Sequence, residues 1–219
     1  MPSGSRSSTV RVAGVDHTTW QGVRMRLLLI GAPGAGKGTQ ATRIADHFGL
    51  VHLSSGDLLR EHVAKGTAIG VTAKGYMDRG DLVPDAVVLD MLRKPVVAAA
   101  EAGGYVLDGF PRTVEQAKAA YGVARDLGVA VQVAVHLEVP HDALVARIVA
   151  RGLTSGRSDD TEEVVARRLR VYEQHTWPLL DYYRDREQLI TVDGDAPMDE
   201  VTAAVVTELE RVREELDRA

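Results

Sequence analysis

The residues with the clearest capacity for chemistry form a glycine-rich run, GAPGAGKGTQ, at Gly31 to Gln40. Glycines let backbone N–H groups turn toward phosphate oxygens, and the N-terminus of a following helix adds the positive end of its dipole. The Lys37 ammonium would supply a full positive charge at the β- and γ-phosphates of a nucleotide. The run therefore predicts a phosphate-binding loop, which needs a buried strand before it and a helix after it.

The residue after the lysine bears on metal binding. Gly38 stands where the general phosphate-loop pattern has Ser or Thr, and Thr39 comes one place later. The hydroxyl that usually binds Mg²⁺ is displaced, so we expect phosphates and waters to hold the ion and carboxylates to orient the waters. Asp108 is the first candidate for this task and Asp57 the second. Since the histidines are scattered and cysteines are absent, we expect no zinc site.

Arginine is the dominant basic residue, because the 26 Lys and Arg residues are 21 arginines and five lysines. A guanidinium grips phosphate through a planar fork of donors that lysine lacks. Arg147 and Arg151 are four apart, so on a helix they share one face and both reach a ligand at its end. A solvated surface is the commoner place for a helical arginine, so the other motifs must decide.

The elements that would position these residues follow from the hydrophobic pattern. Short apolar runs alternate with helix-period segments from Arg26 onward, which predicts β-α units and a parallel sheet. Buried strands are expected at residues 26–31, 105–107, 131–137 and 189–192. Helices are expected at residues 37–48, 57–65, 68–79, 85–102, 113–127, 141–151, 161–183 and 198–216. The predicted fold is α/β, with a parallel sheet of about five strands flanked by helices, as in phosphate-loop nucleoside triphosphatases.

Composition excludes several classes of protein. The 219 residues are 45% hydrophobic and 26% charged with a net charge of −5, which excludes wholesale disorder and disfavours a nucleic-acid partner. No apolar run approaches the roughly 20 residues that span a bilayer. The absence of cysteine permits a reducing compartment, and we expect a cytoplasmic monomer. Residues 1–24 are rich in Ser, Gly and Thr, so we expect a disordered leader, with Met25 as a candidate start site.

Four motifs together resemble the adenylate kinases and their nucleoside-monophosphate kinase relatives. They are the glycine-rich run, LSSGDLLR at residues 53–60, GDLVPD at 80–85 and LDGFPRTVEQ at 107–116. The resemblance extends from Met25 to about Pro197. It implies reversible, Mg²⁺-dependent transfer of the terminal phosphoryl group of ATP to AMP, giving two ADP. It also implies one domain at 25–219, with a monophosphate-binding insertion at 54–83 and a short lid at 150–160.

The same resemblance implies a role for each matching residue. The Ser55 hydroxyl would lie near the acceptor nucleotide, Arg60 and Arg112 on its phosphate, and Gln116 on its base. The acceptor set is Ser55, Arg60, Asp81, Leu82, Val83, Gly109, Phe110, Pro111, Arg112, Gln116, Arg157 and Arg168. The donor set is Gly34, Ala35, Gly36, Lys37, Gly38, Thr39, Arg147, Arg151 and Ala196. Charge at the transferred group would come from Lys37, Arg112, Arg151, Arg157 and Arg168.

Two details concern the donor side and the lid. Arg147 would pack on the donor adenine, which the backbone around Gly194 to Ala196 would also touch. Arg167 competes with its neighbour Arg168, which we favour because it directly precedes Leu169 as in the family. Only residues 152–156 separate Arg151 from Arg157, so closure should move a small loop.

Several alternatives remain open from the sequence. SGD before a helix is also an ordinary N-cap, with Ser55 or Asp57 accepting helix N–H bonds. A pyrimidine-monophosphate kinase would share the scaffold, although Gln116 resembles the adenylate group where the pyrimidine group has Asn. An inactive nucleotide-binding module is the alternative from another class. A guanine-nucleotide switch is disfavoured because the chain has no N-K-x-D motif.

Overall fold

Five short apolar runs pair into one parallel sheet in the order β2-β3-β1-β4-β5. The computed structural model describes residues 25–155, 161–186 and 188–218. The strands are β1 Arg26–Ile30, β2 Val51–Ser54, β3 Tyr105–Asp108, β4 Val133–Glu138 and β5 Gln188–Asp193. The order places β1 at the centre of the sheet, so the loop that follows it lies in the middle of the edge formed by the carboxyl ends of the strands.

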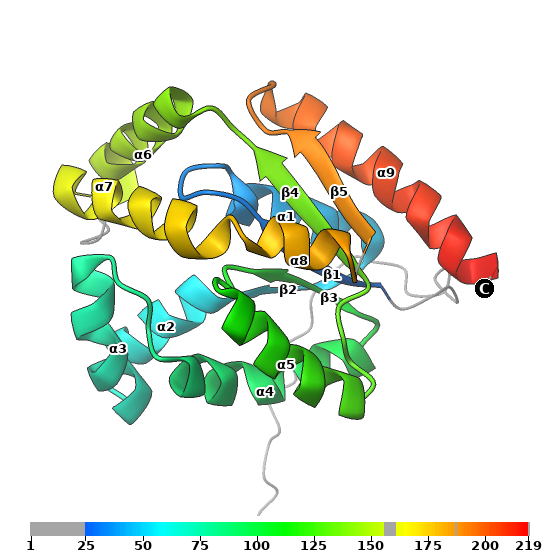
Figure 1. Cartoon of the computed structure of the whole chain (residues 1–219), viewed down its shortest axis with the longest axis horizontal. Helices are drawn as coiled ribbons and strands as arrows, with labels where there is room; N and C mark the ends of the chain where they lie inside the picture. Colours follow the sequence, from blue (N-terminus) through cyan, green and yellow to red (C-terminus); the bar gives the residue numbers. More distant parts are fainter. Residues whose placement is uncertain (1–24, 156–160, 187, 219) are drawn as a thin grey trace, which may run out of the picture.

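Helices connect the strands and cover both faces of the sheet (Figure 1). They are α1 Lys37–Phe48, α2 Ser55–Ala64, α3 Ala68–Arg79, α4 Asp85–Glu101, α5 Val114–Asp126, α6 His141–Ser155, α7 Glu162–Val171, α8 Leu179–Arg184 and α9 Met198–Arg218. None of the described helices is long and apolar enough to cross a membrane.

The two faces of the sheet have separate cores because successive side chains of a strand point to opposite sides. In β1, Leu27 and Leu29 pack in one cluster with residues of α1, α6 and α9. Leu28 and Ile30 pack in a second cluster with residues of α4, α5 and α8. Figure 1 shows α9 on one side of the sheet and α4 and α5 on the other. A strand buried on both faces needs an unbroken apolar run, which explains RLLLI.

Strand β2 is the element that the sequence analysis did not predict, although its estimate of about five strands is confirmed. The strand has only four residues and lies at the edge of the sheet, and Val51 is 38% exposed. Its sequence therefore lacks the continuous apolar run that marks β1.

The single helix predicted at 161–183 is wrong, because the segment is divided. A π-helical turn at Tyr172–Thr176 separates α7 from α8, and the Trp177 N–H donates to the carbonyl of Tyr172, five residues back. Pro178 has no N–H for a regular helical bond, and its ring would clash with the carbonyl four residues before it. The wider turn carries the chain past this position. Helix α6 also differs, since it continues through Ser155, beyond the predicted end at Arg151.

Candidate active site

The glycine-rich run forms the loop between β1 and α1, in the predicted strand-loop-helix order. Gly34 and Gly36 have φ angles of 86° and 88°, which L side chains adopt only with strain. Helix α1 begins at Lys37, with Gly36 as its N-cap. The Lys37 Nζ donates to the carbonyls of Gly31 at 2.9 Å and Ala32 at 3.1 Å, so the ammonium lies against the loop.

The charge on Lys37 lies in an unfavourable environment. Burial lowers its pKa from 10.5 to about 8, against the opposing effect of the Asp108 carboxylate. The positive charges of Arg112, Arg168 and Arg151 contribute to this lowering of the pKa. Four cationic side chains therefore act on one another around the loop, and an anionic ligand would relieve their repulsion.

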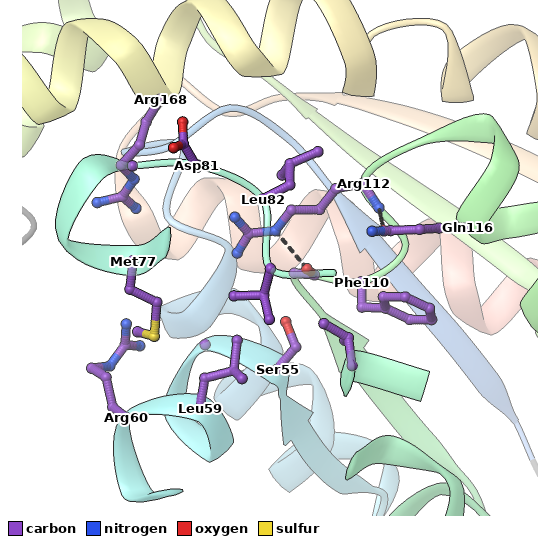
Figure 2. A pocket seen from close by; sticks show the side chains of 15 residues that line it. Ser55, Leu59, Arg60, Met77, Asp81, Leu82, Phe110, Arg112, Gln116 and Arg168 are labelled. Carbon is purple, nitrogen blue, oxygen red and sulfur yellow. Dashed lines mark hydrogen bonds between the residues drawn. The ribbon is translucent and has the colours of Figure 1, made fainter. Parts of the chain in front are cut away.

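A pocket lies beside this loop, between α2, the segment 80–83 and the start of α5 (Figure 2). We call it the Ser55 pocket. Its lining includes most of the residues predicted for the acceptor, namely Ser55, Arg60, Asp81, Leu82, Val83, Gly109, Phe110, Arg112, Gln116 and Arg168. In Figure 2 the guanidinium groups of Arg60 and Arg168 lie on one side, Gln116 on the other, and Arg112 between them. The pocket thus has a cationic end and an amide end.

A second pocket, the Lys37 pocket, adjoins the first. It is lined by Gly31, Pro33 and Lys37 of the loop, and by Pro111 and Thr176. Arg112 and Arg168 line both pockets. The two arginines therefore stand at the junction between the phosphate-binding loop and the Ser55 pocket.

Arg112 is held at this junction by hydrogen bonds of its side chain and of its backbone. Its Nε donates to the carbonyl of Gly109 at 2.7 Å, and its own carbonyl accepts from the Thr176 hydroxyl at 2.8 Å. Thr176 belongs to the π-helical turn, so the irregular segment that the sequence analysis missed contacts the site directly.

The start of α2 shows which residue is the N-cap of this helix. Ser54 is the N-cap, and its Oγ accepts from the N–H of Asp57 at 3.2 Å. Ser55 is instead 1% exposed and lines the pocket. The exposed Asp57 pairs with Arg60, with 2.6 Å between its Oδ1 and the arginine Nη2. The capping explanation therefore applies to Ser54, and Ser55 remains available to a ligand.

Gln116 is 2% exposed and is held from two sides. Its Oε1 accepts from the backbone N–H of Arg112 at 2.7 Å, and its Nε2 donates to Asp85 Oδ1 at 2.7 Å. Sequence analysis included Asp85 only as the last residue of the GDLVPD motif and gave it no role toward Gln116, which is 31 positions later. Its place at the start of α4 has an ordinary explanation, because an acidic residue is common there for reasons of helix stability.

The structure separates the neighbours Arg167 and Arg168. Arg167 forms an ion pair with Asp81, with 2.5 Å between its Nη2 and Oδ1. The hydrogen bond from Arg79, followed by that from Arg167, lowers the pKa of the Asp81 carboxyl. Arg168 instead lines both pockets, which favours it over Arg167 for contact with phosphate.

On the donor side, the structure brings Arg147 of α6 to the turn after β5. The Arg147 Nη1 donates to the carbonyl of Gly194 at 2.8 Å, and Nη2 to Asp195 Oδ1 at 2.9 Å. Two segments predicted to touch the same adenine therefore lie side by side, with the half-buried Ala196 next in the turn. Arg151 lines neither of the two pockets, but its charge reaches Lys37. Thr39 is exposed in the first turn of α1.

Asp108 provides the observation that bears on Mg²⁺. Its carboxylate lies at the carboxyl end of β3, next to the loop, and its Oδ1 is buried with no hydrogen-bond partner in the described part of the chain. Its Oδ2 lies 3.8 Å from where a Cβ on Gly38 would be. A buried acceptor without a donor suits ordered waters around a divalent cation. Asp57 fits less well, since Arg60 occupies it.

Part of the predicted site lies outside the described residues. This applies to Arg157 and to the rest of the lid at 156–160. Among the residues that are described, no cluster of three or more His, Cys, Asp or Glu side chains is placed to hold a metal ion directly.

Comparison with known proteins identifies the family. The family model described as "Adenylate kinase" matches residues 29–188. The chain belongs to the adenylate kinase family. The adenylate kinase of Leptospira biflexa is 46% identical over 181 residues, which are 83% of this chain and 97% of that protein. That of Rhodococcus erythropolis is 45% identical over 185 residues, which are 84% and 99% of the two chains.

A third relative, the adenylate kinase of Phocaeicola vulgatus, is 42% identical over 188 residues, which are 86% of this chain and all of that protein. The residues matched by the family model, 29–188, include every residue that lines the two pockets. The α/β fold with a five-stranded parallel sheet agrees with this membership.

Proposed function

We propose that this member of the adenylate kinase family transfers the terminal phosphoryl group of ATP to AMP, reversibly and with Mg²⁺, giving two ADP. The observation that carries the proposal is the junction of the two pockets. Arg112 and Arg168 line both the Lys37 pocket and the Ser55 pocket, so the same two charges would reach a donor and an acceptor phosphate.

The donor would bind along the loop. The phosphates would lie on the backbone of residues 34–39 at the start of α1, with Lys37 beside the terminal phosphate. The adenine would lie by Arg147 and Ala196, where α6 meets the turn after β5. When bound with ATP, Mg²⁺ neutralises charge on the phosphate oxygens, and Asp108 would orient its waters.

The acceptor would lie in the Ser55 pocket with its two ends matched to the two ends of AMP. Arg60, Arg112 and Arg168 would hold the phosphate, and Gln116 the base, with the segment 81–83 and residues 109–111 around the nucleotide. Within this arrangement, Asp57 must release Arg60 or share it with the ligand, because the two residues are paired.

The transfer step needs charge and alignment more than covalent help. The transition state of phosphoryl transfer is loose, with charge spread over the equatorial oxygens. Lys37, Arg112, Arg151 and Arg168, with Arg157 of the lid, would supply that charge. No general base is needed, because the attacking phosphate of AMP is already an anion. Closure of the lid must exclude water, since water would otherwise accept the phosphoryl group.

The relatives support adenylate specificity over the pyrimidine alternative, because the three relatives described above are adenylate kinases. For the cell, we propose a cytoplasmic monomer. A chain without cysteine needs no oxidising compartment, and residues of one chain line both pockets.

A label-transfer experiment tests the proposal. With ATP labelled at the γ-phosphate and unlabelled AMP, we expect the label to appear in ADP and not as inorganic phosphate. The Lys37→Met variant should lower kcat by on the order of 100-fold or more, since it removes a preorganised positive charge. Label released mainly as inorganic phosphate, or a variant within about threefold of the wild type, would refute the assignment.

A further inference from the structure

Gln116 is buried at the amide end of the Ser55 pocket, and its amide is held in one orientation. A glutamine amide has an acceptor oxygen and a donor nitrogen of nearly the same shape, so rotation by half a turn exchanges them. The side chain can therefore present either pattern of hydrogen bonding to a base unless something fixes it.

The partners of Gln116 allow only one of the two orientations. The backbone N–H of Arg112 is a donor alone, so it requires the amide oxygen. An ionised carboxylate is an acceptor alone, so Asp85 Oδ1 requires the amide nitrogen. A rotated amide would set donor against donor and acceptor against acceptor. The orientation thus follows from the chemistry of the two partners.

The fixed amide retains capacity for a ligand. Its oxygen accepts two hydrogen bonds and its nitrogen donates two, and the protein uses one of each. One acceptor site on the oxygen and one N–H of the nitrogen remain for a ligand. They complement the N6–H donor and N1 acceptor of adenine. They mismatch hypoxanthine, whose O6 is an acceptor and whose N1–H is a donor.

We propose that Asp85 determines base specificity by fixing the orientation of the Gln116 amide, so that the acceptor site selects a 6-amino purine over a 6-oxo purine. Asp85 does not line the pocket and touches the substrate only through Gln116, so it is a positioning residue. This inference rests on the proposed function, because it concerns the acceptor of that reaction.

A structural role for Asp85 is the competing explanation. Asp85 is the acidic residue in the first turn of α4, where a negative charge stabilises a helix. The two explanations predict different results for a variant that keeps a hydrogen-bond acceptor at position 85 but has no charge there. Asp85→Asn loses the charge but keeps an oxygen for the Gln116 nitrogen, whereas Asp85→Ala loses both. Glu115→Ala is a matched control, because Glu115 is the exposed first-turn acid of α5, beside Gln116.

The test measures kcat and KM with AMP and with IMP at saturating ATP. In Asp85→Ala we expect the AMP-to-IMP ratio of kcat/KM to fall about 10-fold, since the hydrogen bond acceptor that fixes the amide is lost. The change should come mainly from a higher KM for AMP, with kcat and the KM for ATP within about twofold. Asp85→Asn and Glu115→Ala should keep the wild-type ratio within about twofold. Asp85→Leu, which also lacks an acceptor, repeats the test on a side chain of similar size.

The outcomes separate this inference from the proposed function. A wild type that does not phosphorylate AMP overturns the proposed function. A wild type that phosphorylates AMP, with an unchanged AMP-to-IMP ratio in Asp85→Ala and Asp85→Leu, overturns this inference alone. Equal losses in Asp85→Asn and Asp85→Ala also overturn it, because charge would then matter more than the acceptor.

Discussion

Lys37 shows how a buried positive charge reduces the stability of the ligand-free protein. Burial and three neighbouring arginines lower its pKa to about 8, from the 10.5 of a free side chain. Between these two values the unfolded chain holds more protons than the folded one. The free energy of unfolding that depends on Lys37 therefore rises as the pH increases from about 8 to about 10.5.

This dependence of stability on pH gives a prediction for the ligand-free protein. As the pH rises from 7 to 10, the wild type should gain stability relative to the Lys37→Met variant, which has no group to titrate there. Urea unfolding of both proteins at several pH values measures the difference in their free energies of unfolding. The contributions of the other titrating groups cancel in this difference. A difference that stays constant across this range would show that Lys37 keeps an ordinary pKa.

The role of Gln116 at the base can be tested by shortening its side chain. Gln116→Asn shortens the side chain by one methylene, so the amide cannot reach both the Arg112 N–H and Asp85. We expect the KM for AMP to rise about 10-fold and the KM for ATP to stay within about twofold. Steady-state kinetics with each substrate varied in turn provide the measurement. Unchanged selectivity for AMP would mean that another group binds the base and determines the selectivity.

The sequence predicted individual residues well where a motif surrounds them. It placed Lys37, Arg112 and Arg168 near a common ligand, and the structure brings all three to one junction. It did not predict that Asp85 holds Gln116, because the pair is 31 positions apart and Asp85 has an ordinary role at a helix start. It also assigned the possible cap to Ser55 or Asp57, whereas Ser54, one residue earlier, does this.

Among the elements, the phosphate-binding loop depends on contact with α6. A Cβ on Gly34 would lie 2.7 Å from Ile148 Cγ1 and 3.0 Å from the carbonyl of Leu144, whereas a Cβ on Gly36 would meet nothing within 4 Å. Both residues have a similar positive φ, so both pay a similar backbone strain on substitution. The pair isolates the effect of the steric contact.

We therefore expect Gly34→Ala to destabilise the protein by about 2 to 5 kcal/mol, from strain of about 1 to 2 kcal/mol and overpacking of about 1 to 3 kcal/mol. Gly36→Ala should cost about 1 to 2 kcal/mol, from the strain alone. Chemical unfolding without nucleotide gives both values. Equal losses of stability in the two variants would show that α6 can move aside without a loss of free energy and does not constrain the loop.

Elements with a strong local pattern were predicted accurately. The predicted bounds of α1 and α3 match the structure, since Gly49 and Gly80 end these helices in the left-handed conformation. Strand β2 was missed because a four-residue edge strand, with only Leu53 buried, has a weak hydrophobic pattern. The division of 161–183 was missed although Pro178 marks it, because the helical period continues on both sides of the proline.

For the whole molecule, the strand order explains why distant motifs meet. In a parallel sheet, ligands bind outside the carboxyl ends of the strands, where the strand order reverses. The loop after β1, Ser55 after β2 and Gly109 after β3 all leave from this edge. Helix α7 borders the same pockets through Arg168 and packs on the end of α3, where a Cβ on Gly80 would lie 3.0 Å from Cγ of Arg168. The two pockets are therefore brought together by topology, and the two cores hold the sheet from both faces.

The central claim is that the two joined pockets transfer a phosphoryl group from ATP to AMP. Its most direct test is Mg²⁺-dependent transfer from ATP to a panel of AMP, CMP, UMP and GMP, with Lys37→Met as the control for contaminating kinase. We predict a strong preference for AMP that is lost in the variant. Preference for CMP or UMP, or no transfer to any acceptor, would contradict the account.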